Sequence, residues 1–141
     1  MASKGNAKWE GDLKGGHGRF TAGEGISGAY SFKSRFEDGD GANPEQLIGA
    51  AHAACFSMSL SNILAEGGHD PVSVETEATV TLRVLDDGPK ITKIALKVVG
   101  TVPGLDDEHF LKHAEEAKAG CPVSKALASV PEITMDASLA G

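Results

Sequence analysis

The sequence is short of aromatic residues and of clustered positive charge, and each shortage excludes a class of protein. Only seven of the 141 residues are Phe, Tyr or Trp, so a core must be built mainly from Ala, Val, Leu and Ile. The 13 Lys and Arg are outnumbered by 20 Asp and Glu, which gives a net charge of −7, and no basic run occurs. Nucleic acids and anionic membrane surfaces both require clustered cations. Neither is therefore an expected partner.

Cysteine is scarce as well, with only Cys55 and Cys121 far apart in the chain. A secreted protein stapled by disulfides carries more cysteines in a shorter sequence. The first residues also lack the apolar stretch of a secretory signal peptide. We therefore expect two reduced thiols, structural or redox-active, in a cytoplasmic protein.

Motifs for metals, nucleotides and membranes are missing too. No CxxC pattern contains either cysteine, whereas zinc needs four ligands. No Walker A sequence occurs, nor a GxGxxG run that leads into a helix. The uncharged residues 47–64 include His, Asn and three Ser, and a membrane span needs about 20 predominantly apolar residues. The sequence thus predicts no cofactor, no metal and no membrane span.

What is present suits a single domain over residues 1–141. Hydrophobic residues make up 40% and charged residues 23%, as in ordinary globular proteins. Ten of the 18 glycines fall within residues 1–41, where turns separate expected strands over 7–12, 17–22 and 29–35. This segment can bury little surface alone, so we expect it to dock on something larger, and pairing with a partner chain would achieve this.

The middle of the chain predicts one long helix from residue 44 to about residue 66. The run NPEQ at 43–46 offers an N-cap, a proline for the first turn, an acidic residue and a capping box. Two glycines at 67 and 68 end the helix. It is uncharged on all faces except near its ends, which is typical of a buried helix. Small residues would allow another backbone to approach closely: Gly49, Ala50, Ala53 and Ala54.

The second half alternates strands and helices. Apolar and polar residues alternate over 72–85 and again over 93–98, which predicts a hairpin. Helical spacing follows over 106–119, then a short helix from Cys121-Pro122 to about residue 129, and a final strand over 133–139. The predicted order βββ-α-ββ-αα-β belongs to the α+β class.

Two residues of the long helix could carry chemistry. Cys55 lies on a helix expected to be buried, and free cysteine often simply packs in a core. His52, three residues earlier, shares its face. The two could serve as nucleophile and base of a cysteine hydrolase, but a core histidine bonded to a carbonyl is the more common case.

Cys121 is in a different setting. It stands directly before Pro122 at an expected helix start, where free N–H groups and the helix dipole stabilise a thiolate. The residues alone therefore indicate Cys121 as the more acidic thiol and Cys55 as the buried one. Taken singly, Arg35 reads as a surface arginine at the end of a strand, and Glu45 as a carboxylate in the first turn of a helix.

Taken together, these segments resemble the OsmC/Ohr family of thiol peroxidases. NPEQLIGAAHAACF at 43–56 resembles the family's hallmark helix, and AGCPVS at 119–124 its second cysteine motif. WEG at 9–11, SRFE at 34–37 and VPGL at 102–105 are similar to the OsmC branch. The resemblance covers essentially the whole chain. It implies an OsmC-like α+β fold, with antiparallel strands around a long central buried helix in an intertwined homodimer.

The resemblance also implies an activity and roles. The enzyme would reduce organic hydroperoxides, and hydrogen peroxide more weakly, in defence against oxidative or osmotic stress. Cys55 would attack the peroxide, and Cys121 would resolve the sulfenate that forms. These roles are the reverse of those that the helix-dipole argument favours. Cys55 then needs a cation, for which Arg35 is the matching arginine and Glu45 the carboxylate that orients it. Arg19 is an alternative, because the Ohr branch takes its arginine from the N-terminal glycine-rich region.

Recycling and substrate preference follow from the same resemblance. An external dithiol would reopen the Cys55–Cys121 disulfide, with no metal or other cofactor. A site lined by Phe56, Met58, Ala and Leu would favour organic hydroperoxides. Two alternatives stay open: a non-catalytic redox-sensing stress protein, and the cysteine hydrolase.

Helix geometry adds an expectation about the dimer. Ten residues separate Glu45 from Cys55, which is about 15 Å along a continuous helix. An Arg35 paired with Glu45 cannot easily reach Cys55 of its own chain. We therefore expect Arg35 and Glu45 to act on the partner's Cys55 and Cys121, with two long helices packed closely and antiparallel.

Overall fold

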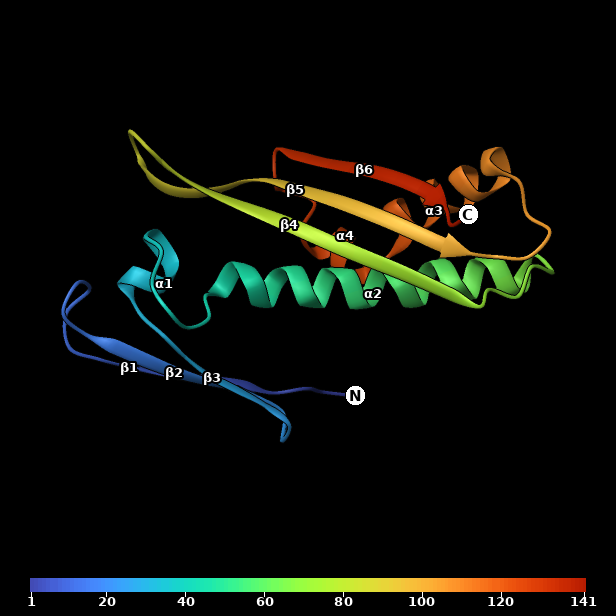
Figure 1. The fold of residues 1–141 in the computed structure, drawn as a ribbon. Helices are drawn as coiled ribbons and strands as arrows, with labels where there is room; N and C mark the ends of the chain where they lie inside the picture. The colour runs from blue at the N-terminus through green and yellow to red at the C-terminus, as the bar shows by residue number, and fades with distance from the viewer. The chain divides into compact units, whose positions relative to one another are not determined.

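The elements follow the predicted order with one addition, a short helix that precedes the long one (Figure 1). The computed structural model describes residues 1–141, which cluster into two units, Met1–Leu47 and Ile48–Gly141. The prediction of one domain, with residues 1–41 pairing with a partner chain, stays a prediction. The elements are β1 (Gly5–Glu10), β2 (His17–Ala22), β3 (Ile26–Tyr30), α1 (Phe32–Phe36), α2 (Pro44–Glu66), β4 (Ser73–Leu85), β5 (Gly88–Thr101), α3 (Asp107–Gly120), α4 (Pro122–Ala126) and β6 (Glu132–Leu139).

The first unit contains a three-stranded antiparallel sheet in the order β1-β2-β3, followed by α1. The expected third strand over 29–35 is wrong in its second half, because the chain turns helical after Tyr30. Ser31 caps this helix: the Ser34 N–H donates to the Ser31 Oγ at 3.1 Å, and the Ser31 N–H donates to the Ser34 Oγ at 2.8 Å. Arg35 therefore lies on a short helix and not at the end of a strand.

Aromatic rings cover one face of this small sheet. The ring centroids of Trp9 and Tyr30 are 5.4 Å apart, and both rings lie over Gly18 of the strand between them. A Cβ at Gly18 would come within 2.6 Å of the Tyr30 ring, so this close packing needs glycine there. The few aromatic residues of the chain are thus concentrated in its first unit.

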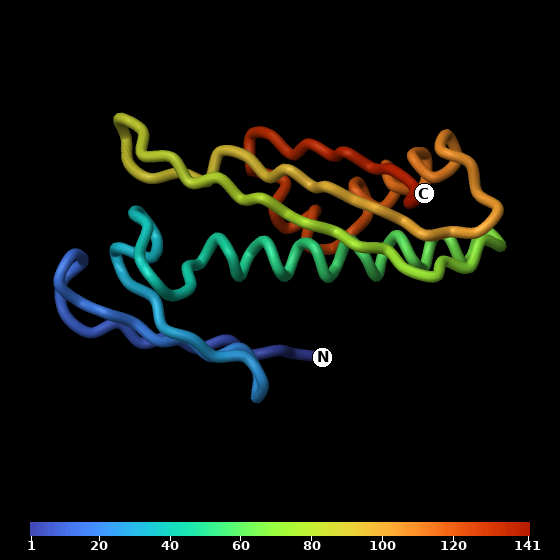
Figure 2. The backbone as a smooth tube through the Cα atoms, viewed as in Figure 1, coloured from blue at the N-terminus to red at the C-terminus, as the bar shows by residue number.

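The second unit contains a sheet in the order β4-β5-β6. β4 and β5 form the predicted hairpin, which reverses between residues 85 and 88 (Figure 2). β6, however, pairs with β5 in parallel, so the expectation that all the strands would be antiparallel is wrong for this strand. The physical reason is the crossover through α3 and α4, because a parallel pair needs a long connection and this one supplies it.

The core of the protein lies between this sheet and the helices α2 and α3, which pack on the same face of it (Figure 1). Every fully or nearly fully buried hydrophobic side chain belongs to this unit. These residues are Phe56, Leu60, Leu64, Ile94, Leu96, Val98, Val102, Phe110, Ala114, Ala117 and Cys121.

α2 buries one face only, so the expected burial on all faces is wrong for the single chain. Its buried residues recur at helical spacing, at positions 45, 49, 52, 56, 60 and 64. The opposite face is exposed and uncharged, with Met58 75% exposed beside Ala50, Ala51 and Ala54. By length and composition alone the helix could cross a membrane, but its buried side chains belong to the core against the sheet.

Candidate active site

The two cysteines meet in the second unit. Cys55 is half-buried on α2, and Cys121 is fully buried between α3 and α4. The Cys121 Sγ and the Cys55 Sγ lie 2.8 Å apart, within hydrogen-bond distance, and both thiols are free. Cys121 is held by the end of α3, where its N–H donates to the Ala117 carbonyl at 2.9 Å. The crossover from β5 thus brings a second sulfur to the one on α2.

The surroundings of the two sulfur atoms differ. Burial raises the pKa of the Cys55 thiol, and its contact with Cys121 raises it further, against a smaller opposing effect of the Val123 N–H. Burial alone would also raise the pKa of Cys121. Hydrogen bonds from Cys55, from the Ser124 N–H and hydroxyl, and from the Val123 N–H outweigh it and lower the pKa of Cys121. Within one chain, Cys121 is therefore the more acidic thiol, as the dipole argument indicates.

No cation contributes to the pKa of Cys55. The groups that shift it are the thiol of Cys121 and a backbone N–H, with no arginine or lysine among them. A thiol that attacks peroxides must be a thiolate. The second unit by itself therefore lacks the charge that would stabilise Cys55 in that form.

His52 does not hydrogen-bond to the cysteine that it accompanies on α2. It is fully buried, and its Nε2 lies 2.7 Å from the Ser124 Oγ. Its Nδ1 is buried without a partner, and burial lowers its pKa. No hydrogen bond joins His52 to Cys55. The expected core histidine is found, but a serine hydroxyl partners it in place of a carbonyl.

Arg35 and Glu45 form an ion pair in the first unit. The Arg35 Nε donates to the Glu45 Oε1 at 2.8 Å. The Glu45 side chain is 8% exposed, and its Oε2 is buried without a partner. The guanidinium also lies over the Phe36 ring, with 5.4 Å between Cζ and the centroid. Because a single Nε–H makes the ion-pair bond, the terminal nitrogens of Arg35 are left for another acceptor.

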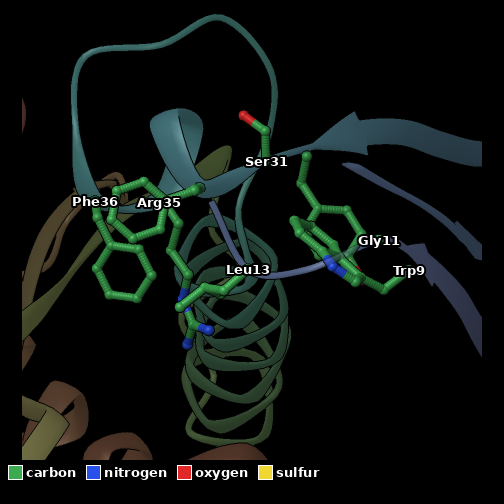
Figure 3. A pocket seen from close by; sticks show the side chains of 8 residues that line it. Trp9, Gly11, Leu13, Ser31, Arg35 and Phe36 are labelled. Carbon is green, nitrogen blue, oxygen red and sulfur yellow. The ribbon is translucent and has the colours of Figure 1, made fainter. Parts of the chain in front are cut away.

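A cavity of about 380 Å³ surrounds this arginine within the first unit. Arg35 lies beside Leu13, with Phe36 on one side and Trp9 on the other (Figure 3). The lining is mostly aromatic and aliphatic: Trp9, Gly11, Leu13, Tyr30, Ser31, Phe32, Arg35 and Phe36. The site therefore combines one cation with an apolar wall.

Arg19 has a different environment. It lies exposed on β2 and lines a separate cavity of about 420 Å³, between residues of β1, β2 and β3. No ion pair joins it to Glu45. Of the two arginines, Arg35 is the one that a carboxylate orients.

Sequence analysis identified Cys55 with Cys121 and Arg35 with Glu45, but it missed some of the residues around them. Phe56 belongs to the core and Met58 is exposed on the uncovered face of α2, so the expected lining by these two residues stays a prediction. The aromatic cavity and Ser124 were missed. The spacing of Ser124, three residues after Cys121 at a helix start, is a signal that could have found it. No group of three or more His, Cys, Asp or Glu is placed to hold a metal ion.

Comparison with known proteins identifies the family of the chain. A family model for OsmC-like proteins matches residues 37–136. The chain is 51% identical to peroxiredoxin OsmC of Escherichia coli K12 over 138 residues, which cover 96% of this chain and 95% of the relative.

More distant relatives carry names from the Ohr branch. The chain is 31% identical over 100 residues to organic hydroperoxide resistance protein-like 2 of Staphylococcus epidermidis, across 71% of this chain and 70% of the relative. The crystal structure of the organic hydroperoxide resistance protein OhrB of Bacillus subtilis matches with a TM-score of 0.71 at 25% identity, across 99% and 98% of the two chains. The chain therefore belongs to the OsmC/Ohr family of thiol peroxidases.

Proposed function

We propose that this protein reduces organic hydroperoxides to alcohols, and hydrogen peroxide more weakly, with Cys55 as the attacking thiol and Cys121 as the resolving thiol. The observation that carries the proposal is the pair of sulfur atoms 2.8 Å apart, one half-exposed and one fully buried. The names of the curated relatives, a peroxiredoxin and organic hydroperoxide resistance proteins, support this reaction class.

Accessibility favours Cys55 as the attacking thiol, although Cys121 is the more acidic one within the chain. A hydroperoxide must reach the attacking sulfur, and Cys121 has no exposed surface. The Cys55 thiolate attacks the distal peroxide oxygen, so an S–O bond forms and the O–O bond breaks. The alkoxide that leaves takes up a proton and departs as the alcohol, and Cys55 becomes a sulfenic acid.

Cys121 completes the cycle. Its thiolate attacks the sulfur of the Cys55 sulfenic acid, an S–S bond forms, the S–O bond breaks, and the hydroxide that leaves is protonated to water. An external dithiol then reduces the disulfide by thiol–disulfide exchange. Such a reductant, and the two free thiols themselves, fit a reducing compartment such as the cytoplasm.

The missing cation supports a shared site in a homodimer. Glu45 and Cys55 lie on one continuous helix, ten residues and about 15 Å apart along its axis. The Arg35–Glu45 pair of one chain would thus serve the partner's Cys55. The exposed, uncharged and small-residue face of α2 is suited to close packing against a second copy. The Arg35 terminal nitrogens would then stabilise the Cys55 thiolate and the charge that develops on the peroxide.

The cavity around Arg35 supports a preference for organic hydroperoxides. An arginine in an aromatic wall offers a polar contact for the peroxide group and apolar contacts for its carbon chain. Hydrogen peroxide can use only the polar contact. This cavity gives the preference a physical basis beside the expected lining by Phe56 and Met58.

One assay tests the function. The protein is incubated with an alkyl hydroperoxide and dithiothreitol or dihydrolipoamide, and peroxide consumption is followed. Wild type should turn over continuously, whereas Cys55→Ser should be inactive. Cys121→Ser should complete one rapid turnover and accumulate an over-oxidisable Cys55 sulfenate.

The same assay separates the alternatives. A redox sensor would oxidise its thiols without sustained turnover, and a cysteine hydrolase would consume no peroxide. If Cys121→Ser loses the first turnover while Cys55→Ser keeps it, the two cysteines have exchanged roles and the assignment is wrong.

A further inference from the structure

A buried hydrogen bond links α2 to the first turn of α4, close to Cys121, and the peroxidase reaction described above does not use it. His52 and Ser124 are both buried, and the His52 Nε2 lies 2.7 Å from the Ser124 Oγ. Ser124 follows Cys121 by three residues, and it is among the groups that lower the pKa of the Cys121 thiol. The pair of His52 and Ser124 thus lies next to the residue that begins α4.

The direction of these hydrogen bonds follows from the unpartnered ring nitrogen. Buried N–H groups without an acceptor are rare in folded proteins. Since the His52 Nδ1 is buried without a partner, the single proton of the neutral ring belongs on Nε2. The Nε2–H then donates to the Ser124 Oγ, which leaves the Ser124 hydroxyl hydrogen free to be donated to the Cys121 sulfur. A sulfur that accepts such a bond is best stabilised as a thiolate.

The environments of the two thiols differ. Cys55 and His52 both project from α2, but the His52 side chain hydrogen-bonds to Ser124, three residues after Cys121, and not to Cys55. Cys55 is the titratable group in contact with Cys121, while α3 contributes apolar residues such as Ala114 and Ala117. No charged side chain contributes to the environment of Cys121, which makes its two polar neighbours decisive.

We propose that His52 and Ser124 are positioning residues that hold the Cys121 sulfur as a thiolate aimed at Cys55, and that they set the rate of the resolving step. The proposal rests on the proposed function and adds residues that act on its second step. In that step the Cys121 thiolate forms the S–S bond, the S–O bond of the Cys55 sulfenic acid breaks, and hydroxide leaves. The Ser124 hydroxyl keeps its own proton throughout.

A direct test measures the acidity of Cys121 without any peroxide. In a Cys55→Ser background, the thiolate absorbance of Cys121 near 240 nm is titrated with and without Ser124→Ala. Loss of a hydrogen bond to a charged group should raise the Cys121 pKa by about one to two units. His52→Leu should also raise the Cys121 pKa. His52→Gln keeps a donor near the Nε2 position, so it should leave the Cys121 pKa close to its value with His52.

A second test measures the resolving step itself. Wild type and Ser124→Ala are mixed with one equivalent of an alkyl hydroperoxide, and the lifetime of the Cys55 sulfenate is followed with a sulfenate-trapping dye. A higher pKa lowers the thiolate population but partly restores nucleophilicity, so resolution should slow about threefold to tenfold. The first turnover, which uses Cys55 only, should keep its rate.

Ser57→Ala is the matched control. Ser57 is also on α2, and its hydroxyl donates to the Thr76 Oγ1 at 2.8 Å, away from the thiols. This variant should leave both the Cys121 pKa and the sulfenate lifetime unchanged. An unchanged Cys121 pKa in Ser124→Ala and in His52→Leu would overturn the proposal, as would a rise of equal size in Ser57→Ala.

The two readouts separate this proposal from the proposed function. If wild type consumes no peroxide, the peroxidase assignment fails whatever the titration gives. If wild type turns over but Ser124→Ala resolves its sulfenate at the wild-type rate, the peroxidase stands and the role of the His52–Ser124 pair is refuted.

Discussion

The two units of the chain hold the two halves of the chemistry in contrasting ways. The second unit places its thiols at the edge of a core in which eleven hydrophobic residues are buried. The first unit places its ion pair beside an aromatic cavity and has no buried hydrophobic residue, its buried polar side chains being Ser34 and Glu45. The thiols are therefore positioned by packing, and the cation by one ion pair and a short capped helix.

This contrast indicates why the sites would be shared. A three-stranded sheet with one aromatic face is near the lower limit of independent stability, so it gains from docking on another surface. If that surface belongs to a second copy, the arginine reaches a thiol only when the dimer forms. Unassembled chains would then carry a weakly acidic, poorly reactive Cys55.

Mixing inactive subunits gives the largest expected effect. Cys55→Ser and Arg35→Ala proteins are each expected to be inactive, and they are unfolded together and refolded. If Arg35 serves the partner's Cys55, each mixed dimer has one intact site and one with both lesions, so activity returns from near zero. Mixed dimers that stay inactive would place the arginine and the thiol of each site on one chain.

Truncation of a core residue should distinguish the stabilities of the two units. Leu60→Ala removes a fully buried side chain of the second unit and should lower the free energy of unfolding by about 2–5 kcal/mol. Leu13→Ala in the first unit, at a side chain 60% exposed, should change it by no more than about 0.5 kcal/mol. Urea unfolding measures both. Equal losses would contradict the contrast between a packed and an unpacked unit.

Removal of Arg35 should change the pKa of Cys55 more than removal of Arg19 does. An opposite charge close to a titratable group shifts its pKa by about 1–3 units. Arg35→Ala should therefore raise the Cys55 pKa and slow alkylation by iodoacetamide about tenfold or more near neutral pH. Arg19→Ala is the matched control and should leave the rate unchanged. Rates measured against pH decide between them, and a larger effect of Arg19 would reverse the assignment.

The smallest effect is a dependence of stability on pH. Burial lowers the pKa of His52 below its ordinary value of 6.5. As the pH falls below about 6.5, the unfolded chain takes up a proton that the folded ring does not. The free energy of unfolding should therefore decrease by at most about 1.4 kcal/mol per pH unit in that window.

A variant of this histidine isolates its contribution. His52→Gln should remove this part of the slope between pH 6.5 and 5, as urea unfolding at several pH values would measure. A wild-type slope that survives in His52→Gln would assign the pH dependence to other groups.

Local chemistry made much of the fold predictable. The capping run at 43–46 gave the start of α2, and Gly68, with φ of +85°, lies just after its end. Strict alternation gave the β4–β5 hairpin. The capping pair of Ser31 and Ser34 was overlooked, so a helix was taken for the end of a strand.

The sequence by itself determined which residues carry the chemistry, because cysteine, arginine and the helix-capping run are recognisable wherever they stand. It also determined that α2 is uncharged, but not that one face stays exposed, since that depends on how many surfaces one chain can lay against the helix. Only the tertiary structure decided that β6 pairs in parallel, that Arg35 and not Arg19 meets Glu45, and that His52 hydrogen-bonds to Ser124. These contacts join residues distant in the chain, and their geometry is set by the packing of a sheet and its crossover helices, which local spacing does not encode.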